Sequence, residues 1–337
     1  MSTPIDAEWL DWVAENRLLG CDAAGMVGAM VARGVAGADA MNAISRIESA
    51  PGFGAAQRLA QRLHKLESVM AQQHRVAMLA PGGIAVERRV AVSGHALLRD
   101  FVAASRPLVL TGLAADWPAL QRWTPQQLAE GYGDVVVEVQ SGRTSDPDFE
   151  LNKLRLRSEM PMATLVQRVL AGAGNDLYLT ANNQALRRPG LAPLLADVGS
   201  LPEWVNRAAL PGAAHVWFGA AGTQTPLHHD TLMLLHTQVV GRKHWRLVSP
   251  WQSPLLYNRH GVFSPVDLAA PDLARHPAAA GAQVIDVVLA PGETLFLPLG
   301  WWHQVVALEV SVSLSFTNLD LPGGFDPHTP HAPQASA

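Results

Sequence analysis

The sequence predicts a mainly β protein, a sandwich or jelly roll, that follows a separate all-α region. Between residues 215 and 318, short β-type segments alternate with turn residues, and no long helical pattern separates them. This spacing is typical of sandwiches and jelly rolls. The first 78 residues instead carry apolar residues at three-to-four spacing, and the run Pro81-Gly82-Gly83 ends that pattern. We therefore expect two folded regions in the 337-residue chain.

Residues 1–80 are expected to form the helical region. Its four predicted helices cover residues 6–18, 22–33, 38–49 and 54–78. Asp6 and Asp22 are suitable N-caps for the first two, because a carboxylate accepts a hydrogen bond from a free N–H in the first turn. Alanine fills many of the small-residue positions, so these helices can approach closely. Docking of a partner and formation of a homodimer are both open functions for this region.

Strands and helices alternate after residue 85, and strands alone fill the last third. Helices are predicted over residues 93–104, from 125 onward and over 162–171; strands are predicted over 86–92, 107–111, 134–140, 177–180, 215–218, 231–240, 244–248, 284–289, 294–297 and 305–316. Residues 141–148 are polar and contain proline, which predicts a loop. The tail, residues 321–337, contains four prolines and is predicted to be disordered.

Composition excludes several classes of function. The single cysteine, Cys21, rules out a disulfide framework and a Cys-rich metal cluster, and it is typical of the reducing cytoplasm. The 25 Lys and Arg against 29 Asp and Glu give a net charge of −4, which argues against a nucleic acid partner. No apolar run is long enough for a membrane span, and the acidic N-terminus lacks signal-peptide features. We expect a cytoplasmic protein without a membrane partner.

Histidine is the conspicuous residue type: eight of the 13 histidines lie between His215 and His303. In the segment Thr225-Pro-Leu-His-His-Asp230, residues two apart share one face of a strand, so His228 and Asp230 would point together. His303 in a later strand would supply a third ligand. Two histidines and one carboxylate form the metal site of non-heme Fe(II) oxygenases. The alternative is a surface turn with an interior histidine.

Lys243 follows a turn at Gly241 and shares a strand face with Trp245 and Leu247. If that face lines the interior, its ammonium needs an anionic partner, because an unpaired buried charge is costly. A dicarboxylate such as 2-oxoglutarate would satisfy this need, one end chelating the metal and the other pairing with Lys243. Its two negative charges would balance the net charge of Fe(II), Asp230 and Lys243. The alternative is a solvated hairpin lysine.

The combination of motifs resembles the JmjC or cupin-like 2-oxoglutarate oxygenases, and most closely the type that hydroxylates an asparagine of hypoxia-inducible factor. The resemblance covers about residues 85–320 and implies a double-stranded β-helix, the cupin jelly roll, with flanking helices. The motifs that carry it, in chain order, are Arg106-Pro-Leu-Val-Leu-Thr-Gly112, Leu177-Tyr-Leu179, Thr225-Pro-x-His-x-Asp230, Gly241-x-Lys243, Pro291-Gly-Glu-Thr-Leu-Phe-Leu-Pro298 and Trp301-Trp-His303.

The resemblance implies a role for each matched residue. It makes His228, Asp230 and His303 the catalytic iron ligands. It also implies a binding site for 2-oxoglutarate, in which Lys243 pairs with the distal carboxylate. The residues implied for that second site are Lys243, Tyr178, Thr225 and Ser315. Ser315 belongs to a row of alternating serines on the last strand, which suits a polar interior.

Two departures bear on the target of the reaction. Leu234 stands where the asparaginyl hydroxylase type has a polar residue, and Val262-Phe263 stand where it has a substrate-gripping Arg-Gln pair. These changes argue against asparagine as the target and leave the metal site intact. Four histidines around the motif, at positions 229, 236, 244 and 260, are expected to have structural roles or to support the metal ligands. Trp301 and Trp302 are expected to hold the loop that carries His303.

The resemblance implies a dioxygenase that uses Fe(II), 2-oxoglutarate and O2, releases succinate and CO2, and hydroxylates a protein or peptide side chain. An N-methyl demethylase or an RNA-base hydroxylase would use the same metal site. A non-redox cupin that only binds ligands is a further alternative, although it has no need of Lys243. A third class is an interaction protein whose working part is the helical region.

Overall fold

The computed structural model describes residues 3–180, 185–258 and 261–322. The chain divides into two compact units, residues 1–75 and 76–337, and each is considered by itself. The predicted disordered tail lies almost wholly outside the described residues. Its first two residues are ordered: Leu321 is buried, and the ring of Pro322 lies against Gly94. The prediction of disorder from residue 321 is therefore wrong for these two positions.

The first unit holds the predicted helices. They are α1 (Ala7–Leu18), α2 (Ala23–Val31), α3 (Gly37–Glu48) and α4 (Phe53–Met78), the last of which continues into the second unit. Asp6 and Asp22 cap α1 and α2 by accepting hydrogen bonds from the backbone N–H groups of Trp9 and Gly25, at 2.9 and 2.8 Å. Helices α1 to α3 enclose an apolar core around Val13, Met30 and Ile44.

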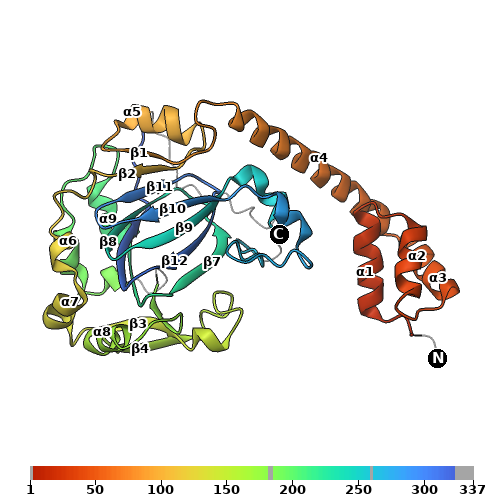
Figure 1. Cartoon of the computed structure of the whole chain (residues 1–337), viewed down its shortest axis with the longest axis horizontal. Helices are drawn as coiled ribbons and strands as arrows, with labels where there is room; N and C mark the ends of the chain where they lie inside the picture. The colour runs from red at the N-terminus through yellow and green to blue at the C-terminus, as the bar shows by residue number, and fades with distance from the viewer. Residues whose placement is uncertain (1–2, 181–184, 259–260, 323–337) are drawn as a thin grey trace. The chain divides into compact units, whose positions relative to one another are not determined.

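The second unit is a two-sheet β structure (Figure 1). Among the described residues, nine strands form the larger sheet, in the spatial order β1 (Glu87–Arg89), β2 (Leu108–Leu110), β11 (Thr294–Leu297), β8 (Leu234–Val240), β13 (Ser311–Phe316), β6 (Ala214–Gly219), β5 (Leu177–Leu179), β3 (Val136–Ser141) and β4 (Arg157–Pro161). Four form the smaller sheet, β10 (Ile285–Leu289), β9 (Lys243–Val248), β12 (Trp302–Ala307) and β7 (Gln224–His229). Except for the parallel pair β1 and β2, neighbouring strands are antiparallel.

Helices cover parts of the larger sheet. They are α5 (Gly94–Leu97), a π-helical turn (Leu98–Val102), α6 (Ala119–Arg122), α7 (Pro125–Tyr132), α8 (Met162–Leu170) and α9 (Leu210–Ala213). Thr124 caps α7 as the sequence predicts, accepting from the backbone N–H of Gln127 at 3.3 Å. Leu128 of α7 and Leu165 of α8 belong to the main core together with strand residues such as Phe218. None of the helices in the described residues is long and apolar enough to cross a membrane.

Several predicted boundaries are wrong. The segment 305–316 is two strands, β12 and β13, because the chain turns at residues 308–310. Leu308 donates its N–H to the carbonyl of Arg242, so this turn lies against the β8–β9 turn. Gly241 has a φ of 68°, and a Cβ there would lie 2.1 Å from the carbonyl oxygen of Val310. Only glycine fits this crossing of two turns.

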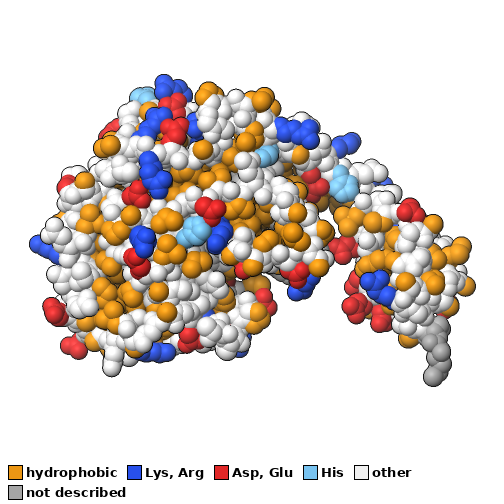
Figure 2. Space-filling view, in the orientation of Figure 1, with side chains coloured by type: hydrophobic (Ala, Val, Ile, Leu, Met, Phe, Trp, Pro, Cys, Tyr) orange, Lys and Arg blue, Asp and Glu red, His pale blue; other side chains and the backbone are white. Residues whose placement is uncertain are grey.

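Other segments differ in extent. The strand predicted over residues 86–92 has three residues, the one predicted from residue 231 begins at Leu234, and the helix predicted over 93–104 is a short α-turn followed by a π-turn. Strand β4 has no counterpart in the prediction. On the face shown in Figure 2, acidic and basic side chains are interspersed, in keeping with the small net charge.

Candidate metal centre and ligand cavity

A cavity of about 350 Å³ lies between the two sheets. The smaller sheet contributes His228, Lys243 and His303 to its walls, and the larger sheet contributes Tyr178 and Ser315. These residues are far apart in sequence and were all singled out from sequence motifs. Asp230 and Thr225 also line the cavity. The structure therefore brings together every residue expected in the metal and 2-oxoglutarate sites.

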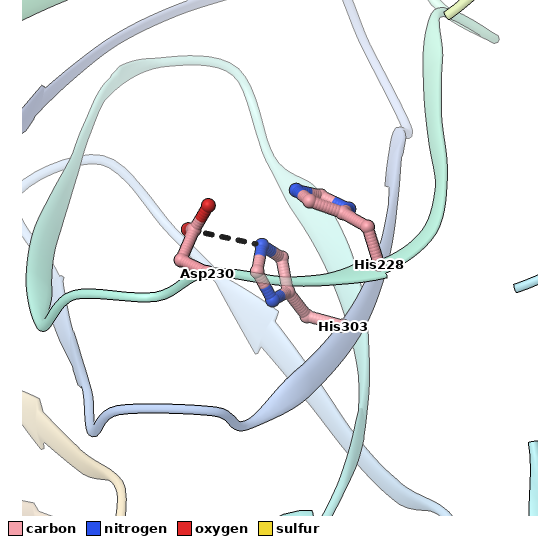
Figure 3. A group of neighbouring side chains, drawn as sticks. All are labelled: His228, Asp230 and His303. Carbon is pink, nitrogen blue, oxygen red and sulfur yellow. Dashed lines mark ion pairs between the residues drawn. The ribbon is translucent and has the colours of Figure 1, made fainter. Parts of the chain in front are cut away.

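Strand register places the two candidate imidazole ligands side by side. His228 on β7 and His303 on β12 are directly opposite one another in the antiparallel ladder, and their ring centroids are 4.0 Å apart. Asp230 follows one residue after the end of β7, rather than inside a strand as expected, and still turns toward them. Its Oδ2 lies 3.8 Å from Nε2 of His303 (Figure 3). One ligand atom from each of the three residues lies within 4.8 Å of the other two.

Backbone carbonyls fix the orientation of both imidazoles. Nδ1 of His228 bonds to the carbonyl oxygen of Pro226 at 2.9 Å, and Nδ1 of His303 bonds to that of Trp301 at 3.0 Å. A carbonyl only accepts, so each Nδ1 carries the proton and each Nε2 keeps a free lone pair. A hydrogen bond of this kind at the other ring nitrogen is usual for metal-binding histidines. The two imidazoles are thus held in the tautomer that a metal requires.

The charges in the cluster also suit a cation. Burial lowers the pKa of His303 well below its ordinary value, and the neighbouring His228 lowers it further. Burial raises the pKa of Asp230, an effect that His228 and His229 partly offset. An imidazole that burial keeps neutral, as at His303, and a carboxylate whose charge burial destabilises, as at Asp230, are donors that a divalent cation stabilises. These three residues fit Fe(II).

Lys243 is buried at 2% exposure, and its Nζ donates hydrogen bonds to two hydroxyls. The acceptors are the oxygen of Tyr178, at 3.1 Å, and Oγ of Ser313, at 2.8 Å. Among the described residues no carboxylate forms an ion pair with it. Burial lowers the pKa of Lys243 to about 7 and raises that of Tyr178. The ammonium is therefore held by neutral groups in a cavity that can admit an anion.

Thr225 and Ser315 complete the polar part of the wall. Thr225 pairs with Val305 across β7 and β12, close to the two histidines. Ser315 accepts a hydrogen bond at 2.9 Å from Nε1 of Trp217. Serines 311 and 313 of the same strand accept from Gln238 and Lys243, so the alternating hydroxyls of β13 do face a polar interior.

Apolar and aromatic side chains form the remaining wall around the metal ligands. Phe263 stacks on His228 with ring centroids 5.7 Å apart, and Trp245 stacks on His303 at 5.6 Å. Leu234 lines the same cavity. Both departures from the asparaginyl hydroxylase pattern, Leu234 and Val262-Phe263, therefore line the cavity and make that part of it apolar.

Sequence reasoning missed Arg143 and Glu150, which lie in or beside the loop predicted over 141–148. Arg143 is buried, and its guanidinium lies 5.2 Å from the ring centroid of Tyr178 and 3.2 Å from the carboxylate of Glu150. It also donates to the carbonyl of Gln224, next to Thr225. Arg143 thus contacts Tyr178 and the backbone beside Thr225, two candidate ligand-binding residues. A polar loop contains no periodic signal that could reveal such contacts.

The neighbouring histidines have other contacts. His229 packs edge-on against Trp302 at 4.6 Å, on the opposite side of β7 from the ligands, and His244 pairs with Asp286 at 2.6 Å. His236 lines the cavity, and its Nε2 has no hydrogen-bond partner among the described residues. His260 lies outside the described residues.

The two tryptophans before His303 anchor its strand. Nε1 of Trp301 donates to the carbonyl of Ser105, and Nε1 of Trp302 donates to Oγ of Ser253. Both rings are buried. Their contacts fit the expectation that they hold the segment carrying His303.

The fold and the cluster together define a class of protein: a cupin-type jelly roll with two histidines and an aspartate facing the cavity between its sheets. The chain belongs to the cupin-like domain family, whose sequence profile matches residues 95–317. The matched range contains the whole cluster and all the residues considered for ligand binding.

The chain is also similar to several proteins whose names describe an activity. The chain is 28% identical over 228 residues to lysine-specific demethylase 8 of Xenopus tropicalis, covering 64% of this chain and 48% of the relative. It is 30% identical over 244 residues to lysine-specific demethylase JMJ30 of Arabidopsis thaliana, covering 68% and 54%. The human bifunctional peptidase and (3S)-lysyl hydroxylase JMJD7 is 27% identical over 252 residues, covering 65% and 78%. The chain spans about half the length of the first two relatives.

Proposed function

We propose that this protein is an Fe(II)- and 2-oxoglutarate-dependent dioxygenase. The observation that carries the proposal is one cavity that contains both a His–Asp–His cluster and a buried lysine bonded only to hydroxyls among the described residues. The cluster fits the metal, and the lysine fits one carboxylate of a dicarboxylate ligand. The hydroxylase and demethylase names of the relatives support the same class of reaction.

Different residues of the cavity would bind the metal and the cosubstrate. His228, Asp230 and His303 would hold Fe(II). The bound metal would couple two reactions: O2 oxidises 2-oxoglutarate to succinate and CO2, and a C–H bond of the substrate is hydroxylated. Lys243 would pair with the distal carboxylate, and Tyr178 and Ser313 hold its Nζ in place. Thr225 and Ser315 would offer further hydroxyls to the cosubstrate. Phe263 and Trp245 would place an apolar wall beside the metal ligands, which would limit side reactions.

For the substrate we propose a side chain of a protein or peptide. A second cavity, of about 600 Å³, adjoins the first and shares Glu150 and Phe263 with it. It offers room for residues that flank a target side chain inserted toward the metal. The human relative's name includes lysyl hydroxylase. Among target side chains, asparagine is the least favourable, because Leu234 and Phe263 are apolar and cannot hydrogen-bond its primary amide.

Two other reactions remain alternatives on the same site. N-demethylation is favoured by the names of two relatives, and it would begin with hydroxylation of a methyl group. RNA-base hydroxylation is raised by a relative from Gallus gallus called tRNA wybutosine-synthesizing protein 5, 27% identical over 237 residues. The net charge of −4 argues against a broad RNA surface. A cytoplasmic location stays a prediction based on composition.

The test is 2-oxoglutarate turnover by the full chain. Purified protein with Fe(II), 2-oxoglutarate and O2 should form succinate, and His228→Ala and Asp230→Ala should abolish it. Mass spectrometry of peptide libraries then separates the reactions: hydroxylation adds one oxygen atom, whereas demethylation removes a methyl group and releases formaldehyde. A wild-type protein that binds Fe(II) but forms no succinate with any substrate class would contradict the proposal and favour a non-redox cupin.

A further inference from the structure

Helix α4 is 26 residues long, and none of its side chains is buried. Among the described residues, the core of α1 to α3 contains no residue of α4, and Ala77, near the end of α4, is the one that packs against a core of the second unit. Leu59, Leu63 and Leu66 are 67%, 54% and 54% exposed. A helix draws most of its stability from a covered apolar face. Three exposed leucines on one face of α4 therefore indicate that another helix or surface covers this face.

The spacing of these apolar residues is that of a coiled coil. Ala56, Leu59, Leu63, Leu66 and Met70 follow one another at intervals of three, four, three and four residues, which is the a/d repeat of 3.5 residues. The b, c and f positions of this repeat are polar or small. They are Gln57, Arg58, Gln61, His64, Lys65, Ser68, Ala71, Gln72 and Arg75. Between residues 56 and 70, apolar and polar residues thus separate as they do on a helix with one narrow seam, which the exposed Val69 flanks at a g position.

Charge at the edges of the seam selects a partner. In the same repeat, Arg62 is a g residue and Glu67 is the e residue five positions later. In a parallel, in-register pair of helices, a g residue faces the e residue five positions further along the other helix. Two copies of α4 would therefore form the pair Arg62–Glu67 twice, once on each side. The other strongly basic residues, such as Arg58 and Lys65, lie at c positions away from the seam.

We propose that α4 is a dimerisation helix whose partner is α4 of a second copy of this chain, in a parallel two-stranded coiled coil. Leucines 59, 63 and 66 would form its centre, and the reciprocal Arg62–Glu67 pairs would set its register. The parallel arrangement brings the C-terminal ends of both α4 helices together. The proposal does not depend on the function of the metal cavity.

Sedimentation velocity of the full chain at about 1–100 µM tests the proposal, because a dimer of typical affinity dissociates within or below this range. Wild type should be dimeric, and Leu63→Lys should weaken the dimer by about 100-fold or more, because it places two ammonium groups in the seam. Arg62→Glu should weaken it by about tenfold, through loss of two ion pairs and repulsion from Glu67. The double variant Arg62→Glu/Glu67→Arg should recover the wild-type affinity.

The matched control is Arg58→Glu, the same change of charge one turn away on the outer face, which should leave the dimer intact. Thermal unfolding of the second unit should be unchanged in every variant, because the substitutions lie outside its core. A wild-type monomer across the concentration range, a dimer that survives Leu63→Lys, or equal effects of Arg58→Glu and Arg62→Glu would each overturn the proposal. A monomer that binds vesicles of anionic phospholipid through these leucines would instead assign α4 to a membrane surface.

Discussion

The interiors of the two units differ in kind. In α1 to α3, every buried side chain among the described residues is apolar, with Val13, Met30 and Ile44 at the centre. Between the sheets of the second unit, a lysine, histidines and several hydroxyls are buried together. An apolar interior contributes stability and needs no other explanation. A buried charge held only by neutral groups lowers stability, so its presence indicates a ligand that supplies the opposite charge.

The substitution Lys243→Met should have the largest effect on 2-oxoglutarate binding, because it removes the charge of the lysine. Methionine is chosen because its side chain is nearly as long. We expect 2-oxoglutarate affinity to fall by about 1,000-fold, in the range found for loss of one partner from a buried charge pair. Thermal stability should rise, since the uncompensated charge is gone. Calorimetric binding and unfolding measurements check both. Lys65→Met on the exposed face of α4 is the control and should change neither; unaltered 2-oxoglutarate binding in Lys243→Met would contradict the assignment of the cavity.

This contrast explains which parts of the site the sequence could predict. The segments around His228 and His303 combine strand patterns with metal-binding residue types, so their convergence follows from the alternation of side chains. Lys243 is recognisable for the same reason. Arg143 and Glu150 reach the site through a polar loop, and their contacts depend on tertiary packing that has no local pattern.

The fold shows the same division. Helix caps at Asp6, Asp22 and Thr124 are local and were predicted correctly. The break between β12 and β13 was missed because residues 308–310 are Leu-Glu-Val, which contain no glycine or proline. Strand β4 was missed because Arg157–Pro161 has no apolar alternation and is held at the sheet edge by its pairing with β3.

Met30→Ala tests whether the apolar interior of the helical unit contributes only to stability. Met30 is fully buried in the core of the helical unit, so truncation should lower the stability of that unit by about 3 kcal/mol, through lost burial and a cavity. Hydrogen exchange should show faster opening of α1 to α3. Affinity for Fe(II) and 2-oxoglutarate should be unchanged. Reduced 2-oxoglutarate affinity in this variant would show that the two interiors are coupled.

The pH dependence of 2-oxoglutarate binding should report directly on Lys243. Burial lowers its pKa to about 7, and a bound carboxylate would raise that pKa again. Below about pH 7 the lysine is protonated before binding, and affinity should depend little on this group. Above it, binding must take up a proton, so affinity should fall by about tenfold per pH unit. Lys243→Arg, which stays protonated, should flatten the profile; a flat wild-type profile from about pH 7 to 9 would contradict the role of Lys243.

Ser313→Ala should produce the smallest change. Its hydroxyl accepts a hydrogen bond from Lys243 at 2.8 Å, and Tyr178 remains to hold the ammonium. We expect a loss of about fivefold in 2-oxoglutarate affinity, equivalent to one hydrogen bond of about 1 kcal/mol. Ser311→Ala on the same strand is the control, because that hydroxyl bonds to Gln238 instead. Equal losses in the two variants would mean that the serine row acts only through strand packing.

The central claim is that one cavity binds Fe(II) and 2-oxoglutarate together, and an anaerobic titration tests it most directly. Adding 2-oxoglutarate to the Fe(II)-loaded full chain should produce the weak visible charge-transfer band of a chelated 2-keto acid. His228→Ala should show no band at any concentration of 2-oxoglutarate. Lys243→Met should show the band only at a much higher concentration of 2-oxoglutarate than the wild-type protein needs. Absence of the band in the saturated wild-type protein would contradict the account.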